Sequence, residues 1–396
     1  MDLESGEARI SSTVTFQLST LDSRPPARAL IDLDAIASNY RLLQGRVGPQ
    51  RAVYAVVKAN AYGHGAPEVA RHLERQGADR FAVAGTEEGV ALRRAGVKGE
   101  ILLLSHAEPA DLPRQRAYGL TPTLSDLAQA RAVIAASRTL SRRLPVQLEL
   151  DTGMGRSGIR PEELNSLIAA LKGAPLLTLA GTFANLSAAD DPASPETGRQ
   201  VAAMEACLSR LRDAGVKPGL VHVANSAGIL AHSGSWLDAV RPGLALYGVA
   251  PSEAIDARNL TPAMTLETNV IGVRRVPAGT PLGYGGRFVT ARETTVAVLP
   301  IGYHDGFRRS FSGRVEVLLR GSKAPVVGSV SMDVTLIDAT GTGAARGDRV
   351  VCLGRDGAES VTAWDLARAA GTIPYEILCG IGSRVDRVYS GSAMAP

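Results

Sequence analysis

The sequence has few cysteines: three in 396 residues, at Cys207, Cys352 and Cys379. Their odd number and wide spacing argue against a disulfide framework, and no Cys or His spacing is typical of a zinc site. The six histidines do not form a recognisable metal-binding pattern either. We therefore expect a reducing compartment, the cytoplasm, and no metal ion.

Long apolar runs are also missing. No stretch reaches the roughly 18 apolar residues that a membrane span needs. The first 26 residues are polar, with several Ser and Thr, and lack the apolar core of a signal peptide. We interpret residues 1–26 as a disordered extension ending at Pro25-Pro26, and we expect a soluble protein without a membrane partner.

The sequence has no basic run either. Its 43 Lys and Arg are scattered against 39 Asp and Glu, the net charge is +4, and aromatic residues make up only 4%. Nucleic-acid binding usually needs clustered cations with interleaved aromatic side chains. This distribution therefore indicates no nucleic-acid partner, although a mildly basic chain suits an anionic cofactor.

What the sequence does contain is enough apolar residues, 45%, for more than one core. In residues 27–257, short apolar runs alternate with helical ones that begin at signals such as Thr86-Glu87-Glu88, Ser125-Asp126 and Pro161. Eight such runs predict strands, namely Ala29–Asp32, Ala52–Val57, Arg80–Ala84, Ile101–Ser105, Val146–Leu150, Leu177–Phe183, Leu220–Val223 and Val240–Tyr247. About eight strand-helix units predict an α/β fold closed into a (β/α)8 TIM barrel.

Residues 258–396 have a different pattern. Runs of β-branched residues joined by Gly and Pro turns predict strands. These runs are Thr265–Val276, Thr294–Ile301, Val315–Leu319, Val326–Asp338 and Val350–Leu353. Helical periodicity is confined to Ala363–Ala370. The sequence therefore predicts a mostly-β C-terminal domain, and no internal repeat is visible.

Lys58 is the first candidate for chemistry. It follows a very apolar predicted strand, and TIM barrels place catalysis at the C-terminal ends of their strands. Burial would depress the pKa of its ammonium and favour the neutral amine that forms a Schiff base. Position alone favours a lysine that reaches solvent from a strand end.

The residues around Lys58 and six further segments carry a resemblance that decides between these interpretations. In chain order the segments are Val56–Gly65, Asp151–Gly158, His222–Ser226, Val240–Gly248, Pro300–Tyr303, Gly328–Asp333 and Thr372–Glu376. Together they resemble the alanine racemase family and span nearly the whole chain after the extension. The resemblance implies a barrel and a β domain, pyridoxal 5'-phosphate as cofactor, an amino-acid substrate, and D-alanine supply for peptidoglycan.

The resemblance also implies two proton carriers. Racemisation removes a proton from one face of the α-carbon and returns it to the other, so two groups must face each other. Lys58 would hold the cofactor as an aldimine and serve one face. Tyr284, in Leu282–Gly285, would serve the other from the partner subunit, which requires a homodimer. Without the resemblance, Tyr284 is simply an aromatic residue in a turn.

Further roles follow from the same resemblance. Arg241 would donate to the pyridine nitrogen with support from His222, and Arg156 and the Met332 backbone would bind the substrate carboxylate. Tyr303 and Tyr375 would narrow the entrance to the active site. The residues implied for the phosphate are Tyr62, Ser226, Gly243, Leu244 and Tyr375. Taken alone, Arg241 could be a surface ion-pair residue, and Asp151–Arg156 a Gly-rich turn.

Two positions depart from the family pattern. Where many members have a lysine that becomes anionic by carbamylation, this chain has Glu149. We expect Glu149 to orient Arg156 directly, unless it is an outward-facing polar residue. Where many members have a histidine near the catalytic tyrosine, this chain has Asn185, which carries no titrating proton. Asn185 leaves the reaction class intact but opens the question of substrate scope.

Three alternatives remain at this point. The first is a racemase of the same family with wider scope, acting on serine or lysine. The second is a barrel decarboxylase, which would pair the ring nitrogen with a carboxylate instead of Arg241. The third is a non-catalytic pyridoxal-phosphate-binding protein, against which the large β domain with Tyr284 argues.

Overall fold

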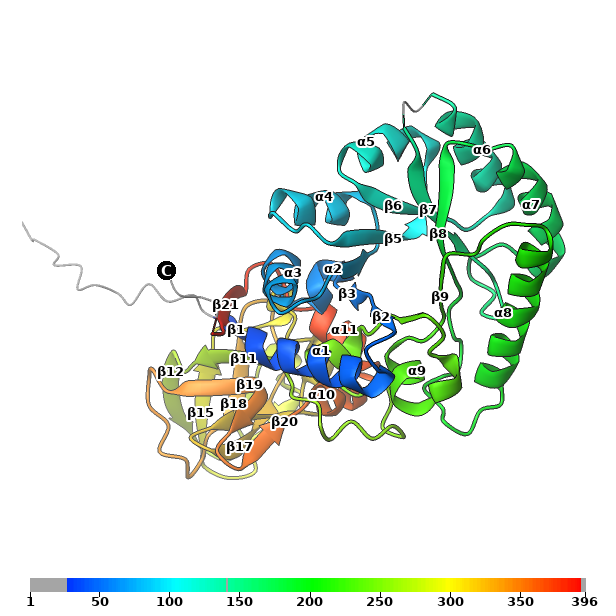
Figure 1. Ribbon diagram of the computed structural model, residues 1–396. Coiled ribbons are helices and arrows are strands. Elements are labelled where there is room, and N and C mark those ends of the chain that lie inside the picture. The colour runs from blue at the N-terminus through cyan, green and yellow to red at the C-terminus, as the bar shows by residue number, and fades with distance from the viewer. Residues whose placement is uncertain (1–26, 140–141, 393–396) are drawn as a thin grey trace, which may run out of the picture.

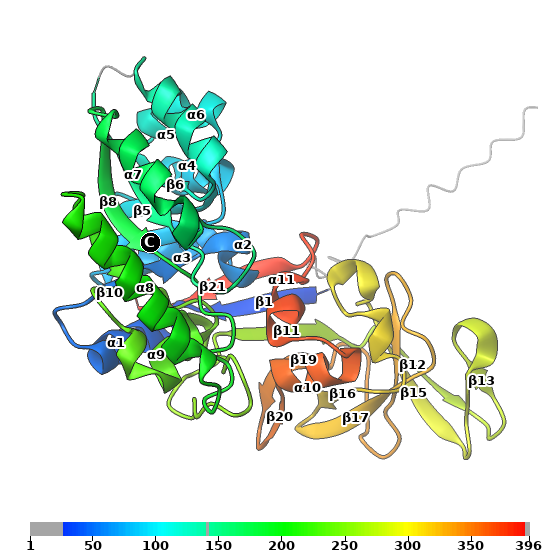
Figure 2. The ribbon, with the colours of Figure 1, turned by 90° about the vertical axis from the view of Figure 1, so that its right-hand side faces the viewer.

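The computed structural model describes residues 27–139 and 142–392, which form a barrel and a separate β domain (Figures 1 and 2). The extension predicted for residues 1–26 lies outside the described residues. In Figure 1 the barrel and its surrounding helices lie apart from the β domain, which carries the later part of the chain. The expected fold class, a TIM barrel followed by a mostly-β domain, is confirmed.

The barrel is a ring of parallel strands in the order β2-β10-β9-β8-β7-β6-β5-β4-β3. Its strands are β2 (Ala52–Val53), β3 (Ala55–Val56), β4 (Arg80–Val83), β5 (Glu100–His106), β6 (Leu120–Leu124), β7 (Leu144–Glu149), β8 (Leu177–Phe183), β9 (Leu220–His222) and β10 (Ala239–Val240). One residue, Tyr54, separates β2 from β3. Because β2 pairs with β10 and β3 pairs with β4, this single segment closes the ring.

Helices surround the ring. They are α1 (Leu33–Val47), α2 (Lys58–Tyr62), α3 (Ala66–Arg75), α4 (Thr86–Arg94), α5 (Leu112–Ala117), α6 (Leu127–Ser137), α7 (Leu164–Lys172), α8 (Glu196–Asp213) and α9 (Ser226–Ala231). Helices α3 to α9 each follow a barrel strand. Helix α1 precedes the first one and packs against α3 and α9, so the N-terminal part of the chain supplies the eighth outer position. Short 3-10 turns are η1 (Pro109–Asp111), η2 (Pro161–Glu163), η3 (Ser233–Ser235) and η4 (Leu244–Tyr247).

The second sheet is mostly antiparallel, in the order β12-β15-β18-β17-β16-β19-β11-β1-β21, with β20 paired to β19. Its strands are β1 (Ala27–Asp32), β11 (Met264–Asn269), β12 (Gly272–Val276), β15 (Thr294–Leu299), β16 (Glu316–Leu319), β17 (Ser322–Val327), β18 (Thr335–Asp338), β19 (Arg349–Asp356), β20 (Glu359–Val361) and β21 (Asp386–Ser390). A hairpin of β13 (Pro281–Leu282) and β14 (Phe288–Val289) stands apart. The remaining elements are η5 (Tyr284–Gly286), η6 (Tyr303–Asp305), η7 (Arg309–Phe311), α10 (Ala363–Ala370) and α11 (Pro374–Cys379).

Local sequence signals explain several boundaries. The Asp32 carboxylate accepts the Ala35 N–H at the start of α1, and Asp126 does the same for Gln129 at α6. Thr362 and its third following residue form a capping box that begins α10. These side chains satisfy helix N–H groups that have no partner within the helix.

Five strand predictions were wrong. In the C-terminal domain, Thr265–Val276 is divided into β11 and β12, and Val326–Asp338 is divided into β17 and β18. The other three errors concern the barrel. The predicted strand Ala29–Asp32 exists as β1, but it pairs with β11 and β21 of the second sheet and not with the barrel. The barrel strand β6 was not predicted. Because β1 was wrongly counted as a barrel strand and β6 was left out, the predicted total was still eight. The run Val240–Tyr247 is not one strand, because it breaks at Pro242 and Gly243 and continues as η4.

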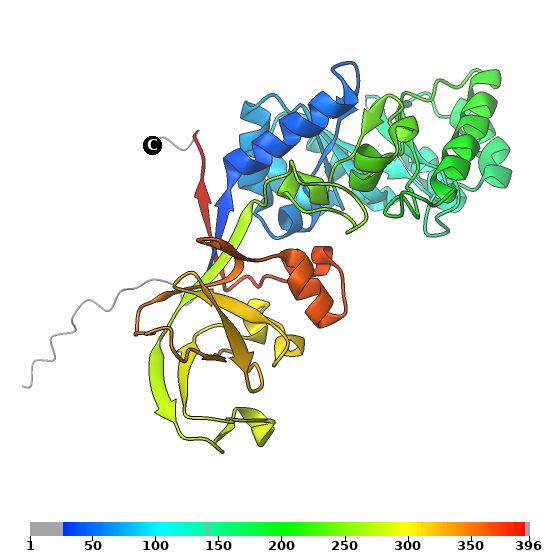
Figure 3. The same cartoon turned by 90° about the horizontal axis from the view of Figure 1, so that it is seen from below.

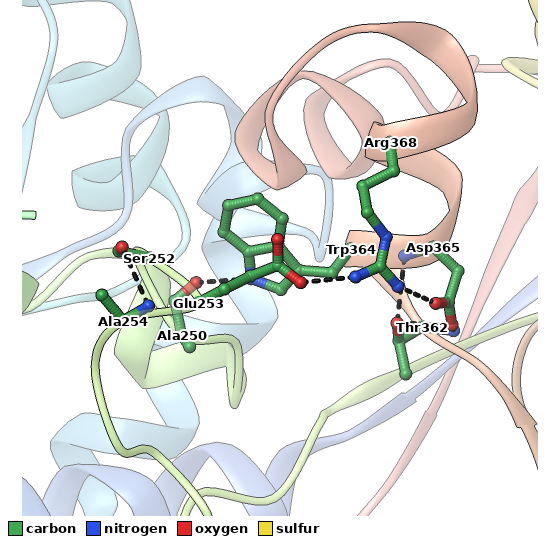
Figure 4. A network of polar contacts seen from close by, with 8 residues as sticks. All are labelled: Ala250, Ser252, Glu253, Ala254, Thr362, Trp364, Asp365 and Arg368. Carbon is green, nitrogen blue, oxygen red and sulfur yellow. Dashed lines mark hydrogen bonds and ion pairs between the residues drawn. The ribbon is translucent and has the colours of Figure 1, made fainter.

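The two domains meet along these terminal strands and at a polar network. Figure 3 shows β1, β11 and β21 running side by side from the barrel to the second sheet. In Figure 4, the Trp364 indole N–H of α10 donates to the Ala250 carbonyl (3.1 Å), and Arg368 pairs with Glu253 (2.5 Å). Within the described residues no helix has the length and apolar character of a membrane span, and no group of three His, Cys, Asp or Glu side chains could hold a metal ion.

Candidate active site

Lys58 lies two residues after the end of β3, at the C-terminal end of the barrel. The next four residues, Ala59 to Tyr62, all have φ of +52° to +55°, so α2 is a left-handed turn of non-glycine residues. Such a backbone costs roughly 1–2 kcal/mol per residue and persists only where surrounding contacts hold it. Two clamps are present: Glu88 accepts the Ala59 N–H (2.8 Å), and the Asn60 side chain accepts the Ala66 N–H (2.9 Å).

The surroundings of Lys58 favour its neutral form. Burial lowers the pKa of Lys58, because its ammonium loses hydration, and the cationic side chains of Arg156 and Arg241 lower it further. A neutral amine is the form that attacks a carbonyl carbon. The predicted reactive lysine therefore has an environment suited to that chemistry.

Lys58, Asn185 and Arg241 line two pockets that adjoin at the top of the barrel, with volumes of about 170 and 360 Å³. The smaller pocket brings together every residue that the sequence assigns to the phosphate. Its lining includes Lys58, Tyr62, Asn185, Ser226, Arg241, Gly243, Leu244 and Tyr375. The larger one adds Glu149, Arg156, Ser157 and Phe183. Residues far apart in sequence thus converge, and of the predicted site residues His222, Tyr284, Tyr303 and Met332 line neither pocket.

Hydroxyl and backbone groups pack closely together at the end of the smaller pocket that contains Tyr62 and Ser226. The Ser226 hydroxyl oxygen accepts the backbone N–H groups of Gly243 (2.9 Å) and Ala245 (3.2 Å). A Cβ on Gly243 would lie 2.5 Å from the Tyr62 hydroxyl oxygen, so only glycine leaves that approach open. The Tyr62 and Tyr375 rings lie 5.8 Å apart, which brings α11 of the β domain to the barrel pocket.

Arg241 is buried and fixed against His222. Its Nη1 donates to His222 Nδ1 (2.6 Å) and to the His222 carbonyl (2.9 Å), and its Nη2 donates to the Ala184 carbonyl (2.8 Å). Burial lowers the pKa of Arg241 to about 10, still far above neutrality. Burial, with Arg241 close by, holds the pKa of His222 well below its usual value, so the imidazole is neutral and can accept. The predicted support of Arg241 by His222 is therefore a direct hydrogen bond.

Glu149 does not form the predicted direct pair with Arg156. Its carboxylate instead accepts the Ser157 hydroxyl (2.9 Å), and no hydrogen bond or ion pair between Glu149 and Arg156 occurs in the described part of the chain. The exposed Arg156 follows a turn in which the Asp151 carboxylate accepts three backbone N–H groups. Glu149 is 5% exposed and faces inward, which excludes an outward-facing polar residue. Burial raises its pKa, and Arg156 opposes that rise through space.

Asn185 lines both pockets. Its side-chain amide contacts the Met154 sulfur (3.1 Å), and its carbonyl accepts the Gln200 side-chain amide (3.0 Å). Asn185 thus holds Met154, in the turn that carries Arg156, against the pocket wall. This contact is one the sequence did not predict.

Tyr284, Tyr303 and Met332 lie on the β domain, and their side chains are exposed by 74%, 43% and 51%. Hydrogen bonds join their loops: Ser329 donates to the Tyr284 carbonyl (3.2 Å), and the His304 N–H donates to the Met332 carbonyl (3.1 Å). The three residues therefore belong to one exposed group of loops, away from the pocket that contains Lys58 of the same chain.

Comparison with known proteins agrees with this geometry. The family model of the alanine racemase N-terminal domain matches residues 31–251, and that of the C-terminal domain matches residues 263–389. An alanine racemase of Symbiobacterium thermophilum is 42% identical over 373 residues, which are 94% of this chain and 99% of the relative.

The chain belongs to the alanine racemase family.

Two solved alanine racemases resemble it closely. The Bacillus anthracis enzyme, with bound L-Ala-P, superposes with a TM-score of 0.89 at 34% identity, covering 93% of this chain and 96% of that one. The Bartonella henselae enzyme, with covalently bound pyridoxal phosphate, gives 0.83 at 33% identity, covering 92% and 99%.

Beside these alanine racemase features, the structure adds residues that sequence reasoning missed. Glu88 was interpreted only as a helix-start carboxylate, yet it holds the turn after Lys58. Ser157 was not singled out, although it is the partner of Glu149. Gln147 accepts from the buried His222, and its one visible signal was an amide between the apolar residues Val146 and Leu148.

Proposed function

We propose that this chain interconverts L- and D-alanine with pyridoxal 5'-phosphate held covalently on Nζ of Lys58. The observation that carries the proposal is one pocket in which Lys58, Arg241 and the hydroxyl groups of Tyr62 and Ser226 converge. Family membership supports the reaction, and the bound molecules named for the two solved relatives support the cofactor and the substrate class.

The residues present fit this cofactor. The two terminal nitrogens of Arg241 donate to protein acceptors, whereas its Nε has no protein partner among the described residues and remains to donate to a pyridine nitrogen. Tyr62, Ser226 and Tyr375 offer hydroxyl groups, and the backbone at Gly243 leaves space for phosphate oxygens. Because a guanidinium donates a hydrogen bond but keeps its proton, Arg241 disfavours the decarboxylase alternative, which would place a carboxylate there.

Two side chains of the enzyme move the proton. Pyridoxal phosphate, when bound, withdraws electrons from the substrate and makes the α-hydrogen acidic. Lys58 Nζ, with its lowered pKa, exchanges that proton on one face. Tyr284 of the partner subunit does so on the opposite face. Because Tyr284 is exposed and lies outside the pocket of its own chain, this assignment requires a homodimer.

Binding and selection fall to residues at the outer side of the pocket. Arg156 presents a planar set of donors for the substrate carboxylate, and the Met332 backbone of the partner adds one more. Tyr303 of the partner and Tyr375 narrow the entrance, which limits the side chain to a small group. Glu149 balances the positive charge of Arg156 and Arg241 through space.

Solvent deuterium incorporation tests the proposal. The purified protein with added pyridoxal phosphate is incubated in D₂O with a panel of L-amino acids, and α-deuteration and D-product are measured. We expect both with L-alanine as the fastest substrate, and neither with the Lys58→Ala variant. Exchange without D-product, or no exchange at all, would refute the racemase, and a faster rate with serine or lysine would establish the broader-scope alternative.

The proposal extends to the cell. Two buried cysteines and one exposed cysteine, none of them paired, fit a reducing cytoplasm. There, a supply of D-alanine would serve peptidoglycan synthesis. Growth of a D-alanine auxotroph that carries this gene, without added D-alanine, tests that role.

A further inference from the structure

A continuous chain of hydrogen bonds runs through the barrel below Arg241. His222 Nε2 contacts Gln147 Oε1 (2.8 Å), Gln147 Nε2 contacts the Tyr54 hydroxyl (2.9 Å), and that hydroxyl contacts Glu100 Oε1 (2.9 Å). Arg241 follows β10 at the pocket end of the barrel, whereas Glu100 begins β5 at the opposite end. This chain of hydrogen bonds therefore connects the pocket to the opposite end of the barrel, where the strands begin.

The three interior links are completely shielded from water. His222 and Gln147 have 0% exposed area, and Tyr54 has 1%. Burying such groups is costly unless every donor meets an acceptor, and a partly satisfied network is worse than an apolar core. A barrel interior that only had to be filled would be filled by branched aliphatic side chains. The polar residues His222, Gln147 and Tyr54 in the barrel interior therefore need an explanation other than packing.

Both ends of the chain fix the direction of every bond. The Arg241 guanidinium only donates, so His222 Nδ1 must accept and its single proton must sit on Nε2. That Nε2–H donates to the Gln147 oxygen, and the Gln147 amide nitrogen donates to Tyr54. At the far end the Glu100 carboxylate only accepts, so the Tyr54 hydroxyl donates to it. Each link thus has one possible orientation.

Ring contacts hold the plane of the same imidazole. The His222 ring stacks on Phe183 at 5.2 Å and 6°, and the Tyr54 ring packs against it at 5.0 Å. Stacking fixes the ring plane but leaves the position of the proton free. With the proton on Nδ1, an N–H group would face the Arg241 N–H group, and Arg241 Nη1 would lose its acceptor on the imidazole.

We propose that Gln147, Tyr54 and Glu100 are positioning residues that hold His222 in its Nε2-protonated form, so that Arg241 keeps its Nε–H directed to the pocket. The inference rests on the proposed function for its catalytic consequence only. Glu100 itself is anchored by Arg80, whose Nε lies 3.4 Å from its second oxygen, at the start of β4.

Replacing Gln147 by Leu removes the acceptor for His222 Nε2–H and keeps a similar volume. We expect two results in the holoenzyme: the Nε2–H resonance of His222 in the [15N]-histidine spectrum shifts, because that proton has lost its acceptor, and kcat for L-alanine falls about tenfold with little change in KM. Gln147→Glu restores an acceptor, so it should recover the original resonance. Tyr54→Phe breaks the next link and should give a smaller loss.

Matched variants separate this role from simple packing. Gln115 and Tyr40 are each 2% exposed, yet neither takes part in this chain of hydrogen bonds. Gln115→Leu and Tyr40→Phe therefore serve as controls. An unchanged His222 spectrum in Gln147→Leu would overturn the proposal. So would a loss of kcat no larger than in Gln115→Leu. The tautomer measurement does not depend on turnover, so failure of the racemase assay with the unmodified protein would refute the proposed function and leave the hydrogen-bond chain testable.

Discussion

We propose that the buried charge of Glu149 takes the place of the modified lysine that the family resemblance implies at this position. Glu149 is 5% exposed, its carboxylate accepts the Ser157 hydroxyl, and it acts on Arg156 through space. A glutamate carries its negative charge without added carbon dioxide. The charge therefore depends on pH, which gives a direct test.

We predict that kcat/KM for L-alanine falls on the acid side as Glu149 takes up its proton. Because burial raises the pKa of Glu149, this loss begins at higher pH than the usual glutamate value of about 4.3. In Glu149→Gln the charge is absent at every pH, so this limb should disappear and KM should rise about fivefold. Ser157→Ala removes a hydrogen bond that lowers the pKa of Glu149, so the acid limb of the profile should remain but shift to higher pH. An acid limb that survives in Glu149→Gln would disprove the role.

Gly243 supports a second prediction at the scale of one atom. A Cβ there would lie 2.5 Å from the Tyr62 hydroxyl oxygen, in the part of the pocket assigned to phosphate. Gly243→Ala should weaken pyridoxal phosphate binding at least tenfold, as measured by titration of the resolved apoenzyme. Gly45→Ala is the control, because a Cβ at Gly45 in α1 meets nothing within 4 Å. Equal cofactor affinity in both variants would contradict this account of the pocket.

At the scale of the element, the left-handed turn after Lys58 is the least expected feature. It holds consecutive residues with positive φ without a glycine, so the strain is carried by Ala59, Asn60, Ala61 and Tyr62. In return, the chain reverses within one turn, which places Lys58 and Tyr62 in the same pocket.

We predict that Ala59→Val destabilises this turn by about 2 kcal/mol, because a β-branched side chain is a severe outlier at φ +52°. Ala91→Val, at an exposed position within α4, should cost only the difference in helix propensity, about 0.6 kcal/mol. Urea unfolding of both variants measures the two free energies. Similar losses would show that the turn is not strained.

Sequence signals located α4, α6, α7 and α10 and misplaced some strands, for local reasons. β6 was missed because Pro122 interrupts its run, and in the sheet the pairing to β5 simply skips that residue. The run after Val240 reads as a strand, but Pro242 and Gly243 turn it into η4 and direct the backbone at the pocket. The apolar residues of β1 predicted it as a strand, but they do not indicate which sheet that strand joins.

At the scale of the whole molecule, two domains and a second copy of the chain complete the proposed site. Tyr375 of α11 reaches the barrel pocket beside Tyr62, and Arg387 of β21 donates to the Gly63 carbonyl (3.1 Å) in the loop after Lys58. The β domain therefore shapes the site within its own chain. Tyr284 lies on an exposed loop and would act in the partner's site.

Mixed dimers test that arrangement. Lys58→Arg and Tyr284→Phe subunits, each nearly inactive alone, should after co-refolding recover about one quarter of the wild-type sites, because half the dimers are mixed and each has one intact site. Activity is measured against the separate variants at the same concentration. Full activity in a monomer verified by ultracentrifugation, or no recovery in isolated mixed dimers, would contradict the shared site.

The sequence predicted the pocket residues better than their partners. Lys58, Tyr62 and Arg241 converge because short motifs mark the ends of parallel strands, and these ends meet at one face of a barrel. Tyr375 reaches the same pocket from α11 of the β domain. The partner of Glu149 was wrong, since a choice between Ser157 and Arg156 depends on side-chain orientation within a single turn. Spacing along a chain does not encode that orientation.

The pairing of β1 has a consequence for how the chain is made. Its partners, β11 and β21, begin at Met264 and Asp386, so the ribosome completes every barrel strand before β1 has a neighbour. Domains generally fold as they emerge, and synthesis proceeds from the N-terminus. We therefore expect the apolar residues Ala29 and Ile31 to lie on an unpaired strand until β11 is made, and this strand to be the part of the nascent chain most in need of a chaperone.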